Sequence, residues 1–203
     1  EGVVPAGVDY AVKLGPWPYD PQKARELLKE AGYPNGFETT LWSAYNHTTA
    51  QKVIQFVQQQ LAQVGIKAQV QALEAGQRVE KVESHQDPAT APVRMYYTGW
   101  SSSTGEADWA IRPLLAGDKT PPFMYNISYY KNDTVDADII KALNTTDRAE
   151  KTRLYTEIQN EVWKDAPWVF LVTEKLLYAT SKNLKGMYVM PDGSYFFEQI
   201  ELN

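Results

Sequence analysis

The sequence predicts an α/β fold in which helices flank a sheet. Residues 37–43 show the period-2 pattern of a strand, because one face would carry Phe37, Thr39, Leu41 and Ser43 and the other the three residues between them. Residues 50–64 then carry an apolar stripe at helical spacing after a cap at Thr48 or Thr49, and residues 66–72 alternate again. A strand, a helix and a second strand form a βαβ unit, whose strands run parallel with a right-handed crossover.

Three further long helices are predicted from their start signals. Asp20 before Pro21 begins a helix, because aspartate accepts free amide hydrogens and proline suits the first helical position. Thr134 is expected to cap a second one, and Asp147, with Glu150 three residues on, opens a third. The short link between the last two helices predicts that they pack antiparallel. Residues 76–83 favour an additional short helix.

Other parts of the chain are predicted from composition. Residues 168–172 form a continuous apolar run, which predicts a strand covered on both faces, and residues 176–180 are a candidate for another. The three glycines and one proline of the first fifteen residues are typical of a linker. After residue 183 the chain is apolar without a clear period and contains a turn at residues 191–193.

The strongest functional signal follows the predicted strand at residues 93–98. That strand breaks at a glycine into Trp100 and four hydroxyl side chains at residues 101–104. An aromatic plate and hydroxyls beyond a strand end suit a polar small-molecule site, although a solvated loop beside a core tryptophan is an equal alternative. Glu106 and Asp108 follow at a helix start, where negative charge is favourable.

A second candidate loop comprises residues 43–49, which lie beyond the carboxyl end of the first strand of the βαβ unit. Ligands in such sheets bind at that end of the strands. Tyr45, Asn46 and His47 supply an aromatic face and hydrogen-bonding groups. The alternative is that Asn46 and His47 only shape the turn before the helix.

Composition excludes several classes of function. The 203 residues are 43% hydrophobic and 22% charged, which is ordinary globular composition. A net charge of −5 and the lack of a lysine or arginine cluster argue against nucleic-acid binding. No cysteine and only two histidines leave little for a metal site. No nucleophile motif or phosphate-binding glycine loop is present, so we expect no cofactor, although a hydrolase acting through Glu106 and Asp108 stays an alternative.

Five stretches of the chain resemble a known family in sequence and order. They are residues 19–36 (YDPQKARELLKEAGYPNG), 60–70, 97–100 (YTGW), 129–143 and 147–171. The resemblance is to the peptide/nickel family of extracytoplasmic solute-binding proteins, which feed bacterial ABC importers. It implies a periplasmic protein, no enzyme, that works with the membrane permease subunits of an ABC importer.

The resemblance further implies a fold with two lobes, of which this chain is the carboxyl-terminal one, with a mixed sheet flanked by helices. Residues 1–18 would be a segment near the hinge, residues 19–183 the ligand-binding lobe, and residues 184–203 a tail that returns toward the missing amino-terminal lobe. The two candidate loops would then form one wall of a cleft between the lobes.

Within the family, residues 41–53 and 99–110 look most like the members that bind glutathione. Dipeptide- and oligopeptide-binding relatives carry an aspartate at the position of Ser103, and dipeptide-binding relatives an arginine near Ala44 or Tyr45. Both departures favour glutathione over an ordinary dipeptide, with another peptide or a metal chelate as alternative ligands. The resemblance and the loops together give these candidate ligand-binding residues: Ser43, Tyr45, Asn46, Tyr97, Trp100, Ser101, Ser103 and Asp108.

Overall fold

The computed structural model describes residues 2–190 and 192–202, which fold into two compact units. The sheet unit comprises Trp17–Gly99 and Thr120–Ile127. The helix unit comprises Glu1–Pro16, Trp100–Lys119 and Ser128–Asn203. Within the described residues, no helix is both long enough and apolar enough to cross a bilayer.

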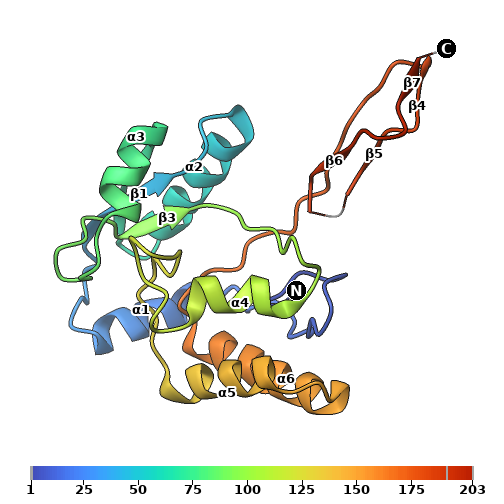
Figure 1. The fold of residues 1–203 in the computed structure, drawn as a ribbon. Coiled ribbons are helices and arrows are strands. Elements are labelled where there is room, and N and C mark those ends of the chain that lie inside the picture. The colour runs from blue at the N-terminus through green and yellow to red at the C-terminus, as the bar shows by residue number, and fades with distance from the viewer. Residues whose placement is uncertain (1, 191, 203) are drawn as a thin grey trace. The chain divides into compact units, whose positions relative to one another are not determined.

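A three-stranded parallel sheet forms the centre of the sheet unit (Figure 1). Strand β1 (Glu38–Ser43) lies between β2 (Lys67–Ala72) and β3 (Met95–Tyr97), and Leu41 pairs with Val70 on one side and with Met95 on the other. The predicted α/β class and the parallel βαβ unit are confirmed. Both pairings in this sheet are parallel, and the antiparallel pairs of the chain lie in the tail.

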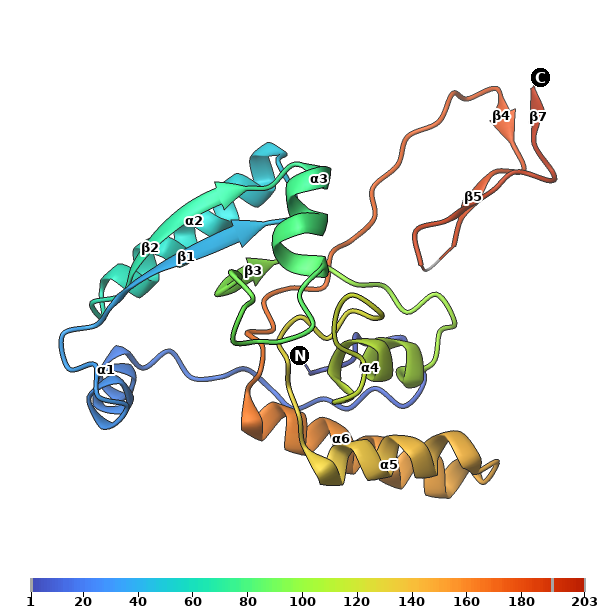
Figure 2. The same ribbon diagram turned by 60° about the vertical axis from the view of Figure 1, so that its left-hand side comes forward.

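Helices cover both faces of this sheet (Figure 2). Helix α2 (Thr48–Ala62) packs Ile54 against Leu41. The short helix α3 (Ala75–Arg78) continues into the π-helix η1 (Val79–Glu83), whose buried Val82 packs against Trp42 on the other face. Leu41 and Trp42 reach opposite faces because consecutive side chains of a strand alternate. The helix expected at residues 76–83 is therefore present as two joined pieces.

Helix α1 (Pro21–Glu30) begins as predicted, since the Asp20 carboxylate accepts a hydrogen bond from Lys23 N (2.8 Å). None of its residues is buried. Polar contacts attach it to the loop after α2: Arg25 Nη2 donates to Gln63 O (2.9 Å) and the Tyr19 hydroxyl donates to Gln63 Oε1 (2.9 Å). Of the apolar positions that predict this helix, Ala24 and Leu28 are half-buried and Leu27 is 51% exposed.

Three helices build the helix unit: α4 (Ala107–Leu115), α5 (Asp133–Asn144) and α6 (Arg148–Asp165). As predicted, α5 and α6 lie side by side and antiparallel (Figures 1 and 2). The core shared by all three helices includes Ile111 of α4, Ile139 of α5 and Ile158 of α6. Val3 and Val4, at 7% and 2% exposure, belong to the same core, so the glycine- and proline-rich start of the chain is packed against these helices.

Two of the predicted helix caps are wrong by one or two positions. The His47 ring, at Nδ1, accepts the hydrogen bond from Ala50 N at the start of α2, in place of Thr48 or Thr49. Asn132 Oδ1 caps α5 by accepting from Thr134 N (3.0 Å) and Val135 N (3.2 Å). Asp147 caps α6 as predicted, accepting from Ala149 N (2.8 Å).

The prediction of strands at residues 168–172 and 176–180 is wrong. Neither stretch joins a described ladder, and Val169, Val172 and Leu177 are 83%, 72% and 92% exposed. An apolar run becomes a strand only when its backbone pairs with another strand, and neither run pairs with any of the described strands.

The tail after residue 183 contains short antiparallel pairs. Strand β4 (Leu184–Lys185) pairs with β7 (Glu201–Leu202), and β5 (Tyr188–Val189) pairs with β6 (Tyr195–Phe196). Pro191, the first residue of the predicted turn, lies outside the described residues. The domain boundaries expected at residues 18 and 183 stay predictions.

Candidate ligand-binding site

Ser43 ends strand β1 and shapes the loop that follows it. The residue is fully buried, and its Oγ accepts from Tyr45 N (3.0 Å) and donates to Tyr45 O (2.8 Å). Serine commonly forms such local bonds where a chain turns. Its hydroxyl is therefore used inside the loop.

Tyr45 joins the ends of β1 and β3. Its hydroxyl accepts a hydrogen bond from Gly99 N (3.0 Å), and its ring meets the Tyr97 ring edge-on at 5.9 Å between centroids. The two tyrosines meet because Ser43 and Tyr97 are register partners at the ends of parallel strands. The structure thus brings Ser43, Tyr45 and Tyr97 together into an aromatic patch with polar edges at the carboxyl end of the sheet.

Asn46 and His47 have the local roles that the alternative interpretation assigned to them. Gln51 Nε2 donates to Asn46 Oδ1 (2.9 Å) and to Asn46 O (3.2 Å), and His47 caps α2. Asn46 is exposed, and its own amide nitrogen takes no part in these bonds. A role of this amide nitrogen in ligand binding stays a prediction.

Trp100 begins the second candidate loop, which belongs to the helix unit. Its indole Nε1 donates to Trp109 O (2.8 Å), and the two indole rings lie 5.9 Å apart between centroids. The residue is 37% exposed. The hydrogen bond to α4 fixes the orientation of this partly exposed aromatic surface.

Residues 101–105, here called the hydroxyl loop, divide their hydroxyl groups into two sets. Ser102 Oγ donates to Glu106 O (2.7 Å), and Thr104 Oγ1 accepts from Glu106 N (3.4 Å), so these two hold the loop in shape. Ser101 and Ser103 are exposed, and within the described chain their hydroxyls make no hydrogen bond. Two of the four hydroxyls therefore stabilise the loop, and ligand binding by the other two stays a prediction.

Both carboxylates after the hydroxyl loop are paired with cations. Arg112 donates two hydrogen bonds to Asp108, from Nε to Oδ1 at 2.9 Å and from Nη2 to Oδ2 at 2.7 Å. Lys151 Nζ lies 2.8 Å from Glu106 Oε1. The hydrogen bond to Asp108 raises the pKa of Arg112, as the bond to Glu106 raises the pKa of Lys151. The two negative and two positive charges cancel. Pairing with cations thus explains why two acids lie here, and no role in hydrolysis is needed to explain them.

Arg112 and Lys151 were missed as members of this site. Arg112 follows Asp108 by four residues on a predicted helix, a spacing that favours an ion pair and could have identified it. Lys151 lies 45 positions from Glu106, and no local pattern indicates that contact.

The predicted site residues thus form two groups. Ser43, Tyr45, Asn46 and Tyr97 lie in the sheet unit, whereas Trp100, Ser101, Ser103 and Asp108 lie in the helix unit. The peptide bond between residues 99 and 100 joins the groups along the chain. A shared cleft lined by both stays a prediction.

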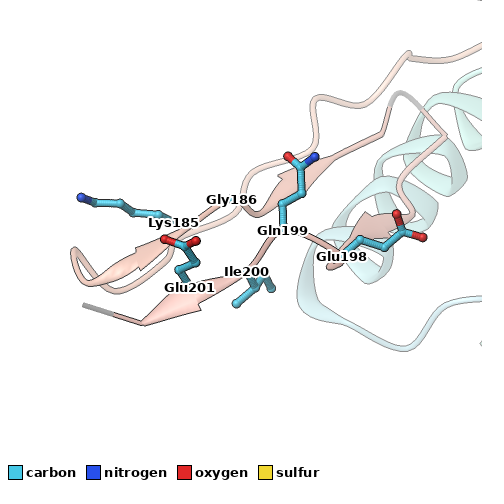
Figure 3. Close-up of a pocket in the computed structure, with 6 residues that line it drawn as sticks. All are labelled: Lys185, Gly186, Glu198, Gln199, Ile200 and Glu201. Atoms are coloured by element: carbon cyan, nitrogen blue, oxygen red, sulfur yellow. The ribbon is translucent and has the colours of Figure 1, made fainter.

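Surface hollows occur elsewhere on the chain. One of about 550 Å³ lies in the tail, where Lys185, Gly186, Glu198, Gln199, Ile200 and Glu201 line it (Figure 3). Another is lined by Glu26, Lys29 and Glu30 of α1. Neither contains a predicted site residue, and no group of three or more described acidic or histidine side chains is arranged to hold a metal ion.

Comparison with known proteins gives matches along the whole chain. The model of a family described as bacterial extracellular solute-binding proteins, family 5 Middle, matches residues 1–122. The glutathione-binding protein GsiB of Pectobacterium atrosepticum is 60% identical over 202 residues, which are 100% of this chain and 39% of that protein. The GsiB of Escherichia coli K12 is 59% identical over 201 residues. The chain thus spans 39% of the length of these curated relatives.

Solved structures show the same fold. The periplasmic binding protein DppA of Helicobacter pylori, in complex with the peptide STSA, superposes with a TM-score of 0.69 and 30% identity over 83% of this chain and 32% of that one. A dipeptide-binding protein from Pseudoalteromonas sp. SM9913, in complex with Met-Leu, has a TM-score of 0.79 at 22% identity and covers 100% of this chain and 39% of its own. The second likeness shows the fold alone.

Proposed function

We propose that this chain, which belongs to the bacterial extracellular solute-binding proteins of family 5, is the carboxyl-terminal part of a protein that captures glutathione in the periplasm. The captured ligand would be passed to the membrane permease subunits of an ABC importer. The observation that carries the choice of ligand is the hydroxyl loop next to Trp100 in the chain: two of its hydroxyls make no hydrogen bond within the described chain, and the two acids that follow it are balanced by cations.

The loop chemistry suits an anionic peptide. Glutathione carries net negative charge at neutral pH, so an unpaired carboxylate in the site would repel it and lose hydration on binding. Glu106 and Asp108 are each neutralised by a cation, and position 103 carries a neutral serine. The Ser101 and Ser103 hydroxyls can donate to ligand carboxylates. The Trp100 ring supplies apolar surface for the peptide backbone.

The sheet unit would add a second set of contacts. We infer that the Tyr45 and Tyr97 rings pack against the ligand and that the Asn46 amide nitrogen donates to one of its oxygens. Buried Ser43 would act by holding the turn that places Tyr45. The remaining contacts would come from the amino-terminal lobe, which this chain does not contain.

Other ligands of the same class are the alternatives. A dipeptide or oligopeptide has a free α-ammonium group, and position 103 offers it no carboxylate. A metal chelate would need either charge or exchangeable ligands beside the aromatic patch. Identity to glutathione-binding relatives favours glutathione over both.

Calorimetry on the full-length protein tests the proposal. We expect glutathione to bind and a neutral dipeptide and a nickel chelate to bind more weakly, and native mass spectrometry to detect retained glutathione unchanged. Trp100→Ala should weaken glutathione binding, whereas the control Trp17→Ala, which removes a tryptophan that is 54% exposed elsewhere on the chain, should not. Tight dipeptide binding without glutathione binding would overturn the proposed ligand.

A further inference from the structure

The amino-terminal segment of the chain forms backbone hydrogen bonds at the end of the hydroxyl loop. Asp9 N donates to Gly105 O (2.9 Å), and Ala107 N donates to Asp9 O (3.2 Å). Asp9 and Glu106 therefore form a small parallel bridge at the point where the loop enters helix α4. One end of the loop is fixed by backbone bonds to residues about a hundred positions away in sequence.

Helix α6 supplies a second contact with Glu106, an ion pair. Lys151 Nζ lies 2.8 Å from Glu106 Oε1, and the two side chains are 22% and 35% exposed. The pair is therefore partly shielded from water and less screened than an ion pair on the open surface. The ion pair and the backbone bridge meet at Glu106.

The amino-terminal segment is itself anchored to α6. Gln159 is fully buried; its Nε2 donates to Tyr10 O (2.7 Å) and its Oε1 accepts from Val12 N (3.1 Å). Tyr10 has a positive φ of 66°, which is uncommon for a residue other than glycine, and its ring lies 5.3 Å from that of Tyr155. The packed helix α6 thus fixes both supports of the loop.

We propose that Lys151 is a positioning residue for ligand binding: through Glu106 it fixes the loop that presents Trp100, Ser101 and Ser103. This inference rests on the proposed function of that loop. Lys151 is itself committed to Glu106, so it acts through the loop and not by touching the ligand. A loop ordered before binding loses less conformational entropy when it binds, and loosening the loop therefore weakens affinity.

The test compares Lys151→Met with Lys164→Met in the full-length protein. Lys164 is the matched control because it lies on the same helix and pairs with Glu161 at 3.3 Å, away from the loop. We expect Lys151→Met to raise amide hydrogen exchange several-fold at residues 105–107 without ligand, and to weaken glutathione binding about fivefold. Lys164→Met should change neither, and Lys151→Arg should restore both.

The two measurements separate the inference from the proposed function. If the parent protein binds no glutathione but exchange still rises in Lys151→Met, the proposed function fails and the support of the loop by Lys151 stands. Unchanged exchange in Lys151→Met overturns the positioning role. Raised exchange with full glutathione affinity also overturns it, as does an equal effect of Lys164→Met, which would indicate a general loss of stability.

Discussion

Replacing Gln159 by leucine should remove the hydrogen bonds that attach the amino-terminal segment to α6. The side chain is fully buried and makes three hydrogen bonds, to Tyr10 O, Tyr155 O and Val12 N. Leucine has a similar volume, so the change removes the polar contacts without opening a large cavity. The Tyr10 carbonyl and the Val12 amide are then left without their partner in a partly buried setting.

The expected magnitude follows from those orphaned groups. A satisfied hydrogen bond contributes about 1 kcal/mol, and a buried polar group left unpaired costs about 1–3 kcal/mol. The Tyr155 carbonyl lies within helix α6 and is the least affected. Burial of leucine in place of an amide offsets part of the loss. We expect the free energy of unfolding to fall by about 2–4 kcal/mol.

Urea denaturation and hydrogen exchange together measure this effect. The matched control is Asn160→Leu, since Asn160 is the next residue, is exposed, and donates only to Thr156 O within the helix. It should change the free energy of unfolding by less than about 0.5 kcal/mol. The Val12 amide should exchange faster in Gln159→Leu alone. If both variants unfold at the same urea concentration and the Val12 amide keeps its protection, the anchoring role of Gln159 is refuted.

Three further outcomes are expected. In the full-length protein, calorimetry should show that Trp100→Ala weakens glutathione binding by about 1–3 kcal/mol, and an unchanged affinity would remove Trp100 from the site. Ser103→Asp should weaken glutathione binding through charge repulsion while Ser103→Ala leaves thermal stability unchanged; equal affinity of the aspartate variant would contradict the argument from charge. Burial raises the pKa of Tyr96 to about 12, against about 10 for an unfolded tyrosine. The unfolded chain therefore loses this proton first, and stability should fall as pH rises from 10 toward 12. Urea midpoints should show a shallower fall in Tyr96→Phe.

The βαβ unit could be predicted because its signals are local. Strand alternation at residues 37–43 and the apolar stripe of α2 each lie within one element, and the order of elements then fixes the parallel pairing. The caps show the limit of local signals. A helix can be capped by any of Asn132, Asp133 and Thr134. The conformation of the backbone before α5 selects Asn132, and the sequence does not reveal that conformation.

The strands expected at residues 168–172 and 176–180 failed for a different reason. Their side chains have strand propensity, but a strand also needs a neighbouring backbone edge, and that edge is a property of the rest of the molecule. Helix α1 shows the same dependence: its start is local and correct, yet none of its apolar residues is fully buried in the described chain. Local propensity alone thus decides neither whether a strand forms nor how deeply a helix is buried.

The electrostatics of the candidate site depended in part on a contact that is distant in sequence. Residues 100–108 contain two acids and no base, and local spacing indicates a cation partner for Asp108 only. In the folded chain Arg112 and Lys151 cancel both charges, and Lys151 comes from a helix 45 residues away. The hydroxyl groups follow the same logic, because only the closed turn assigns Ser102 and Thr104 to structure and leaves Ser101 and Ser103 free. For the proposed anionic ligand, the affinity should therefore depend on the Lys151–Glu106 contact between α6 and the start of α4 as well as on the residues that touch the ligand.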